Sequence, residues 1–423
     1  MKFAPSFFDQ VKATLIHISK GGKPVLIKKL KIAPYRLFLV LLDIITLPIS
    51  IPLILLIRLI KPIYHIHLGY FYGGRIGHFV HDTVLIKLEI EKKQKGLYLF
   101  YFLPNISNKQ WAKMVRRELN IYFWVRFLVF ANSLIPGGED HAVVPGLNQH
   151  NVSRDTNGLI YNSNLTFQFT DFETIKVKKW LKERGWQEGE KIICVLVRDN
   201  AYLPGNNWSY HDFRNSNISN FIPAMEFLAN KGYWVIRMGK LMKEPLNSLN
   251  NRIIDYSFDK YMNDLIDVWL FANCDLCITT ASGPDAISCV YRRPLLHINS
   301  LPLTHIESYA NVVHAPKKLF WKKSGKLLTF KEYCDNDFSY SERYEYHGIN
   351  IVELTSDEII NIVKEKIEMI EGENIESEED KLIQKKFWKE GFKIKKFANL
   401  NGFIHPEAKI SNSFVKQFPN WFE

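Results

Sequence analysis

The stretch from Asp275 to Asn299 constrains the fold most, because it contains every part of a parallel α/β unit in order. A short apolar run ends in a turn of small residues, Ala281 to Gly283, and a second apolar run follows from Pro294 to Asn299. Pro284 stands where a helix would begin, and it has no amide hydrogen to leave unpaired there. The stretch therefore predicts a strand, a loop, a helix and another strand.

The turn in this stretch is suited both to start a helix and to hold an anion. Ser282 can cap the helix, and Asp285 suits the positive end of its dipole. Ligands of open α/β sheets bind at the carboxyl ends of the strands, and free amides at a helix N-terminus favour phosphate. We expect a nucleotide-diphosphate site at Ser282, Gly283 and Asp285. The alternative is a turn without a ligand, because Ser-Gly-Pro is common in turns.

The same alternation of strand and helix precedes this stretch. Apolar runs predict strands at Ile192–Val197, Tyr233–Met238 and Ile253–Tyr256, and periodic segments predict helices at Ile175–Arg184, Ser219–Asn230 and Tyr261–Ala272. We expect a doubly wound parallel sheet in a second domain, residues 174–370. Residues 371–423 should form an acidic linker and a helical tail that docks on the body, because the chain ends in the apolar run 414–422.

Charged side chains follow two of these predicted strands. Arg198 and Asp199 come directly after the first strand, and Arg237 and Gly239 end the second. Arginine can hold a phosphate through two hydrogen bonds. The long polar loop that contains Asn215 should carry specificity. The predicted donor-binding residues are Arg198, Asp199, Asn215, Arg237, Gly239, Ser282, Gly283 and Asp285.

The first domain, residues 62–173, is predicted as a smaller Rossmann-like unit. Tyr64–Leu68, Leu97–Phe102 and Val125–Phe130 are candidate strands, and the glycine turn 73–77 leads into an apolar-periodic helix. The full G-x-G-x-x-G spacing is absent, so the turn is a weak dinucleotide fingerprint.

His78 follows the glycine turn and is the candidate general base. Histidine titrates near neutral pH and can take a proton from a hydroxyl, and Asp82, one helical turn further on, can orient it. The alternative is a histidine that only makes a structural hydrogen bond. Acidic and histidine residues at 139–141 are a second candidate set.

An apolar run of 24 residues, Leu37–Ile60, is long enough to cross a bilayer, which needs about 20 residues. It contains Pro48 and Pro52, which should break it into two arms, and basic residues flank both of its ends. Matching basic flanks favour a re-entrant hairpin with both ends on the cytoplasmic side. A single bent span and a buried helix pair are the alternatives.

The net charge of +11 is uneven along the chain. Residues 1–61 hold ten Lys or Arg and two acids, a net charge of +8. Because this excess lies beside the apolar run, it indicates anionic lipid as a partner and argues against nucleic acid. The five cysteines lack the spacing of a disulfide scaffold and indicate a reducing compartment.

Several short motifs within residues 64–300 together resemble a family of glycosyltransferases found with bacterial surface-polysaccharide synthesis, whose members resemble the two-domain GT-B fold. The motifs are Val197–Asp199, Arg214–Ser216, Gly232–Tyr233, Arg237–Gly239, Asp255–Tyr256 and Thr280–Gly283. The resemblance implies transfer of a sugar from a nucleotide-sugar donor, and its motifs do not fix the acceptor. With the apolar run in view, we expect a membrane-associated glycan or lipid-linked acceptor. The apolar run lies outside the resemblance, and its basic flanks lead us to expect the protein on the cytoplasmic face of the inner membrane.

In an inverting mechanism, His78 would deprotonate the acceptor, while Arg198, Arg237 and the amides at Ser282 and Gly283 would stabilise the departing diphosphate. We expect no metal and no cofactor beyond the donor. Two alternatives remain: a sugar-nucleotide epimerase on the same architecture, and a membrane-tethered scaffold that binds no nucleotide.

Overall fold

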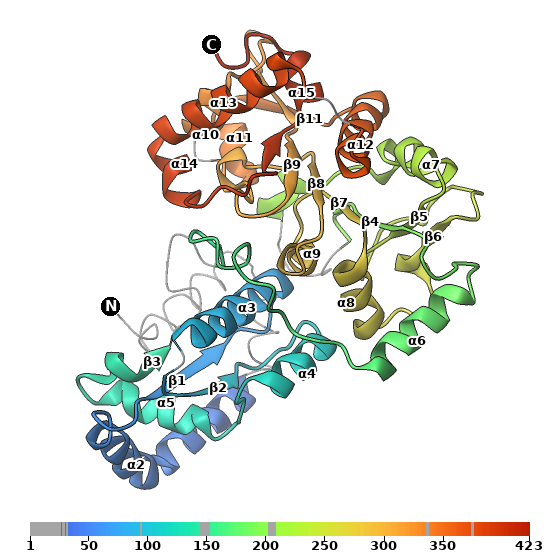
Figure 1. Ribbon diagram of the computed structural model, residues 1–423. Coiled ribbons are helices and arrows are strands. Elements are labelled where there is room, and N and C mark those ends of the chain that lie inside the picture. The colour runs from blue at the N-terminus through green and yellow to red at the C-terminus, as the bar shows by residue number, and fades with distance from the viewer. Residues whose placement is uncertain are drawn as a thin grey trace. The chain divides into compact units, whose positions relative to one another are not determined.

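A computed structural model describes residues 27, 30, 33–93, 95–143, 153–201, 209–335, 338–373 and 376–423. The chain divides into two compact units, the first up to Ser153 and the second from Arg154 on. Both are α/β, with parallel main sheets (Figure 1).

The boundary between the units precedes residue 174, where the sequence analysis begins the second domain. Residues after Ser153 belong to the second unit because its side chains hold their backbone. The Arg292 guanidinium donates to the carbonyls of Ile160, at 2.9 Å, and Leu165, at 3.0 Å. The Tyr291 hydroxyl donates to the carbonyl of Phe167.

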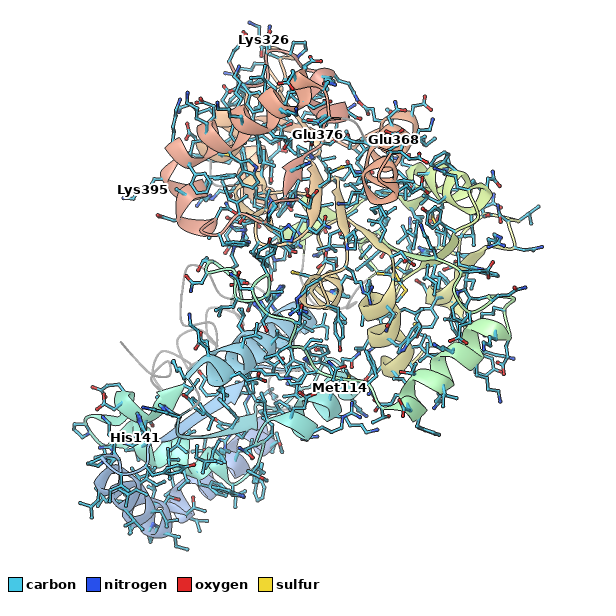
Figure 2. All side chains as sticks on the ribbon, viewed as in Figure 1. Met114, His141, Lys326, Glu368, Glu376 and Lys395 are labelled. Atoms are coloured by element: carbon cyan, nitrogen blue, oxygen red, sulfur yellow. The ribbon has the colours of Figure 1, made fainter. Side chains whose placement is uncertain are left out.

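The first unit contains a small parallel sheet in the order β2-β1-β3, with β1 paired to β2 from Ile66↔Leu97 to Phe71↔Phe102. Its elements are α2 (Leu47–Leu59), β1 (Ile66–Phe71), α3 (Ile76–Lys93), β2 (Leu97–Phe102), α4 (Lys109–Glu118), α5 (Val125–Leu134), the 3₁₀ turn η1 (Gly138–His141) and β3 (Ala142–Val143). The helix α3 makes the crossover between β1 and β2. Met114 is fully buried, and its position in α4 is labelled in Figure 2.

The prediction of a strand at Val125–Phe130 is wrong, because these residues begin the helix α5. The β-branched and aromatic residues there favour a strand by propensity. The buried positions, however, are Val125, Leu128, Ala131 and Asn132, which recur at helical spacing. Tertiary packing of that face against β1, β2 and α2 decided the outcome.

Most of the apolar run Leu37–Ile60 lies in two helices, Ala33–Ile45 and α2, which bend by 60° at their junction. No single helix among the described residues is long and apolar enough to cross a membrane. Among those residues, only this bent pair, taken as one segment, has the required length and apolar composition. The break falls at Thr46, so Pro48 stands in the first turn of α2, where a missing amide costs little. Pro52 lies inside α2 and does not interrupt it.

The second unit contains a seven-stranded, wholly parallel sheet in the order β12-β9-β8-β7-β4-β5-β6. Its strands are β4 (Ile192–Leu196), β5 (Trp234–Arg237), β6 (Ile253–Asp255), β7 (Leu276–Thr279), β8 (Leu295–Ile298), β9 (Val312–Ala315) and β12 (Lys409–Ile410), with an antiparallel pair, β10 (Lys318–Trp321) and β11 (Ile349–Val352).

Helices cover both faces of this sheet, as the predicted doubly wound fold requires. They are α6 (Asp171–Lys182), α7 (Ile222–Asn230), α8 (Asp264–Asn273), α9 (Ala286–Val290), α10 (Phe330–Asp335), α11 (Ser341–Tyr346), α12 (Ser356–Glu371), α13 (Glu378–Lys393), α14 (Lys395–Leu400) and α15 (Asn412–Lys416). One layer contains α6, α8 and α9, and the other contains α7 and α12 (Figure 1). The helix α6 begins before the predicted Ile175, because Thr170 and Glu173 form a capping box.

The tail after α12 packs on the second unit. Gly372 ends α12 in the left-handed conformation, and Ser377 caps α13. Phe414 and Trp421 are buried, and the carbonyl of Trp421 accepts a hydrogen bond from the amide of Phe330. The aromatic residues near the C-terminus therefore form part of the core.

Candidate functional site

The order of the large sheet reverses between β4 and β7. From β4 the chain continues to β5 and β6 on one side, and then returns to β7, β8 and β9 on the other. Such a switch point leaves a crevice at the carboxyl ends of its two central strands, and ligands of open α/β sheets bind there. The strands β4 and β7 end in Arg198–Asp199 and in the 280–283 turn. Tertiary structure therefore joins the two most informative stretches of the sequence.

Arg198 is tied to this turn and to the 214–216 loop. Its amide donates to Thr280 Oγ1 at 3.0 Å, and its Nε donates to Asn215 Oδ1 at 3.0 Å. The amide of Ser216 donates to the Arg198 carbonyl at 2.9 Å. Asn215 thus lies beside Arg198, so two of the predicted donor-binding residues are hydrogen-bonded to each other.

A second guanidinium, that of Arg214, lies close to Arg198. Its Nη2 donates to the carbonyl of Ala281, which has a left-handed backbone with φ of 55°. Burial, and then the charge of Arg198, lower the pKa of Arg214 to about 10. Its Nε is buried and has no hydrogen-bond partner among the described residues. Two cations so placed repel each other, and an anionic ligand would relieve that repulsion.

The turn at Ser282–Asp285 differs from the prediction in its detail. A 3₁₀ turn, η5 (Gly283–Asp285), precedes the five-residue helix α9. The buried Asp285 carboxylate accepts from the Ser282 amide at 2.8 Å and from Thr279 Oγ1 at 3.0 Å. The Asp285 carboxylate therefore takes up the Ser282 amide, one of the amides predicted to bind the diphosphate. Burial raises the pKa of Asp285 to about 6. Gly283 is exposed, and its amide makes no hydrogen bond within the described chain.

Three other predicted donor residues shape the neighbouring loops. Asp199 accepts from the amides of Ala201, at 2.9 Å, and Lys243, at 2.7 Å. Arg237 is only 1% exposed and donates to the carbonyl of Glu244 at 2.6 Å. Gly239 has φ of 145°, where a side chain would be strained. The polar groups of Asp199 and Arg237 thus hold loops, and Arg237 does not face solvent.

The structure also reveals polar groups that the sequence analysis did not single out. Burial, and then the nearby Asp285 carboxyl, raise the pKa of Glu307 to about 8. Its Oε2 is buried without a partner among the described residues, as is Nε2 of His297. His297 Nε2 lies 3.9 Å from Asp285 Oδ2, and burial lowers its pKa to about 3. The sequence analysis named Arg214 only within the motif Arg214–Ser216 and not as a donor-binding residue, and no local signal marks Glu307.

In the first unit, the structure places His78 and Asp82 on either side of Ser153. His78 Nδ1 lies 2.7 Å from Ser153 Oγ, which donates to Asp82 Oδ1 at 2.8 Å. Burial, and then Arg75, lower the pKa of His78, while burial raises that of Asp82 to about 6. Nε2 of His78 makes no hydrogen bond to any described residue. Among the described residues, the imidazole is therefore held through Nδ1 alone.

The alternative base residues at 139–141 lie at the opposite edge of the small sheet. His141, labelled in Figure 2, bonds through Nδ1 to the carbonyl of Ile66, at the start of β1. Asp140 is exposed and pairs with Lys61 at 2.5 Å. His78 instead follows the carboxyl end of β1, the edge at which α/β sheets present site residues.

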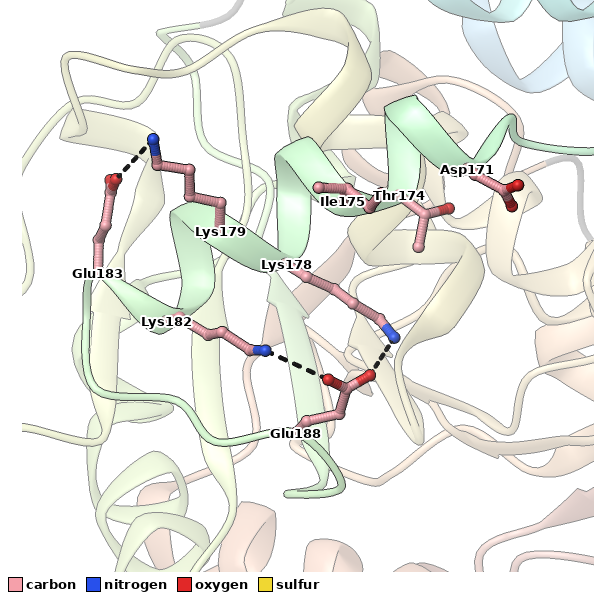
Figure 3. Close-up of a pocket in the computed structure, with 8 residues that line it drawn as sticks. All are labelled: Asp171, Thr174, Ile175, Lys178, Lys179, Lys182, Glu183 and Glu188. Atoms are coloured by element: carbon pink, nitrogen blue, oxygen red, sulfur yellow. Dashed lines mark hydrogen bonds and ion pairs between the residues drawn. The ribbon is translucent and has the colours of Figure 1, made fainter.

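A shallow pocket on the outer face of α6 belongs to neither set of residues (Figure 3). Its lysines pair with nearby acids, and Lys182 Nζ lies 3.2 Å from Glu188 Oε2. The lining comes from α6 and the turn that leads into the amino end of β4. Among the described residues, no group of three or more His, Cys, Asp or Glu is arranged to hold a metal ion.

No family model and no curated protein matches the sequence. Solved structures with a similar arrangement include a glycosyl transferase of family 9 from Veillonella parvula DSM 2008, at 10% identity and a TM-score of 0.38, covering 60% of this chain and 86% of that one. E. coli ADP-heptose lps heptosyltransferase II aligns at 13% identity and a TM-score of 0.35, covering 56% and 86%. E. coli heptosyltransferase WaaC with ADP aligns at 9% identity and a TM-score of 0.33, covering 71% and 98%. All three neighbours are glycosyltransferases by their own descriptions.

Proposed function

We propose that this protein is a GT-B-like glycosyltransferase of bacterial surface-polysaccharide synthesis. It transfers a sugar from a nucleotide-sugar donor to a membrane-associated glycan or lipid-linked acceptor, with inversion and without a metal ion. The observation that carries the proposal is the pair of guanidinium groups, Arg198 and Arg214, beside the 280–283 turn at the switch point of the large sheet.

The donor diphosphate binds to the second unit in this proposal. Arg198 and Arg214 supply positive charge, and the exposed Gly283 lets the diphosphate approach the backbone closely. The Arg198 side chain is preorganised by Asn215, so less entropy is lost when the anion binds. The same charges stabilise the diphosphate as it leaves.

The acceptor hydroxyl is activated in the first unit, by His78. Nε2 takes the hydroxyl proton while the acceptor oxygen forms a bond to the anomeric carbon. The bond from that carbon to the diphosphate oxygen breaks, and the nucleoside diphosphate leaves with the electron pair. Burial lowers the pKa of His78, so the imidazole is neutral and able to accept a proton at neutral pH.

The bent helix pair tethers the enzyme to the cytoplasmic face of the inner membrane in this proposal. The outward side of α2 is apolar and exposed at Ile49, Leu53, Leu56 and Leu59. An ordinary surface helix carries polar residues on that side, and a large apolar face indicates a lipid or protein contact. The net charge of +8 in residues 1–61 favours an anionic lipid surface.

Two contacts fix the helix pair to the rest of the first unit. Buried Asp43 accepts two hydrogen bonds from Arg126, including one from Nε at 2.7 Å. Arg58 donates to carbonyls that follow α5, at Ile135 and Pro136. These bonds hold the pair against α5, so we propose that it lies in the membrane surface and does not span the bilayer.

Calorimetry with nucleoside diphosphates tests the donor site. Arg198→Ala and Arg214→Ala should each weaken binding by about 1.5 to 3 kcal/mol, the range for a hydrogen bond to a charged group. Gly283→Val should block the diphosphate sterically. The control is Arg252→Ala, since Arg252 bonds to Gly232 and Glu190 in the same unit. Unchanged affinity in all three site variants would remove this site from consideration.

The fate of a bound donor separates the alternatives. A glycosyltransferase transfers the sugar when an acceptor is present, whereas an epimerase changes the sugar without an acceptor. A scaffold binds no nucleotide. Chromatography of the reaction products with membrane extracts as acceptor, at increasing donor concentration, distinguishes these outcomes.

A further inference from the structure

We propose that Ser153 is a positioning residue that fixes the tautomer of His78. Its hydroxyl holds the imidazole with the proton on Nδ1 and the lone pair on Nε2. This inference deepens the proposed function, because only that tautomer lets Nε2 act as the base. It stands on the series of contacts from His78 Nδ1 to Ser153 Oγ and from Ser153 Oγ to Asp82 Oδ1, at 2.7 and 2.8 Å.

Proton counting along this arrangement determines the tautomer. An ionised carboxylate only accepts hydrogen bonds, so the single Ser153 hydroxyl proton points to Asp82. Ser153 Oγ then has lone pairs but no proton for His78. The bond at 2.7 Å therefore requires that Nδ1 of His78 donates.

Burial and backbone conformation both bear on this arrangement. Ser153 and Asp82 are 7% and 5% exposed, so water competes little for their polar atoms. Ser153 has φ of 64°, a left-handed backbone that is unfavourable for most residues other than glycine. A glycine would relieve this backbone strain but would supply no hydroxyl. The backbone and the hydroxyl can therefore be tested separately.

The charged groups near His78 and Ser153 are consistent with a proton on Nδ1 of His78. Burial raises the pKa of Asp82 to about 6, so at pH 7 and above its carboxylate is mostly ionised. Arg75 is the charged group that acts on His78, and His81, on the same helix, bonds to the Gly77 carbonyl. When Asp82 is protonated, it can donate to Ser153, which can then donate to Nδ1. The imidazole proton would move to Nε2 and the base would be lost.

The test is the tautomer of His78 in the full-length resting protein, read by long-range proton–nitrogen NMR with ¹⁵N-histidine. His78→Gln identifies the His78 signals. We expect the Nδ1–H tautomer in the unaltered protein at pH 8. Ser153→Ala and Ser153→Gly should both shift the population towards Nε2–H. In both variants turnover should fall by about tenfold to a hundredfold while donor affinity is unchanged.

Ser153→Gly is the matched variant, because it suits the left-handed backbone and keeps the fold. If Ser153 served only the backbone, Ser153→Gly would behave like the unaltered protein in both readouts, and the proposal would be overturned. It would also be overturned if the resting protein held His78 as Nε2–H. A third outcome separates the two proposals. If NMR confirms the Nδ1–H tautomer but His78→Ala keeps full turnover, Ser153 still fixes the tautomer, and the catalytic role of His78 is refuted.

Discussion

The backbone amide of Arg198, at the end of β4, donates a 3.0 Å hydrogen bond to the hydroxyl of Thr280, at the end of β7. Thr280 is 1% exposed and Arg198 is partly buried, so water has only limited access to this bond. It fastens together the two strand ends at which the order of the sheet reverses. The position of Arg198 relative to the 281–283 turn therefore depends on a side chain 82 residues away in sequence.

Replacing Thr280 with valine keeps the shape of the side chain and removes the hydroxyl. The partly buried Arg198 amide would lose this hydrogen bond, and we expect the free energy of unfolding to fall by about 1 to 3 kcal/mol. Donor affinity should also fall, because Arg198 loses its fixed position. Urea denaturation and calorimetry measure the two effects. Thr280→Ser, which retains the hydroxyl, is the control and should change both much less.

His78→Ala should reduce turnover by at least about a hundredfold at saturating donor and acceptor, since a general base contributes about 10² to 10⁴ in rate. His78→Gln should be nearly as poor, and Asp82→Asn should fall between, because it keeps an acceptor oxygen without the charge. His141→Gln is the control at the other edge of the small sheet. Near-normal turnover in His78→Ala would mean that the base lies elsewhere.

The acid limb of the pH–rate profile should lie below pH 6.5. The base works when deprotonated, and burial together with Arg75 lowers the pKa of His78 from its ordinary value of 6.5. Removing the positive charge in Arg75→Gln should raise that pKa and move the acid limb to higher pH. Initial rates at saturating substrates from pH 5 to 8 measure the shift. A limb that stays in place in Arg75→Gln would show that another group controls it.

Glu307→Gln should stabilise the protein at high pH. The pKa of Glu307 is raised from 4.5 to about 8, so the folded state binds a proton that the unfolded state has lost over this interval. The contribution of Glu307 to stability therefore declines as pH rises from about 4.5 to 8. Glutamine does not ionise. At high pH the free energy of unfolding of the variant should therefore exceed that of the unaltered protein by on the order of a few kcal/mol.

Urea denaturation at pH 5 and pH 8.5 checks this expectation for Glu307. The gain should be clear at the higher pH and small at the lower one. Glu345→Gln is the control, because it makes the same chemical change at a side chain that is 79% exposed. Equal stability differences at both pH values would contradict the raised pKa.

Leu53→Glu with Leu56→Glu should reduce binding to anionic vesicles by about tenfold or more, because both side chains lie on the exposed apolar side of α2. Flotation with phosphatidylglycerol vesicles measures this. Leu249→Glu, at a 98% exposed leucine of the second unit, is the control. If the double variant instead lost self-association and kept its vesicle binding, the partner of this side of α2 would be a second copy of the chain.

Truncation of residues 1–61 is a poorer test of membrane binding. Ile54 is fully buried and packs with Leu128 and Ala131 of α5. Removal of α2 would expose this core, whereas substitution of the outward side chains leaves it intact.

The sequence by itself determined the parts of the fold that depend on local patterns. Apolar runs located β2 at Leu97–Phe102 and β4 at Ile192–Leu196, because a buried parallel strand must be apolar along its whole length. The turn of small residues before Pro284 located the end of β7. The same reasoning selected His78 and Arg198, since both follow strand ends in the sequence.

Only the tertiary structure decided the properties that depend on residues far apart in the chain. Val125–Leu134 became a helix because its helical face packs on α2 and the small sheet, against its strand propensity. The partnership of His78, Asp82 and Ser153 joins positions 71 and 75 residues apart, and Arg237 became buried through a loop that follows β5. Local patterns fix which segments form strands and helices, but strand order and side-chain burial arise when those segments pack together. Contacts between distant residues therefore had no signal in any single stretch of the sequence.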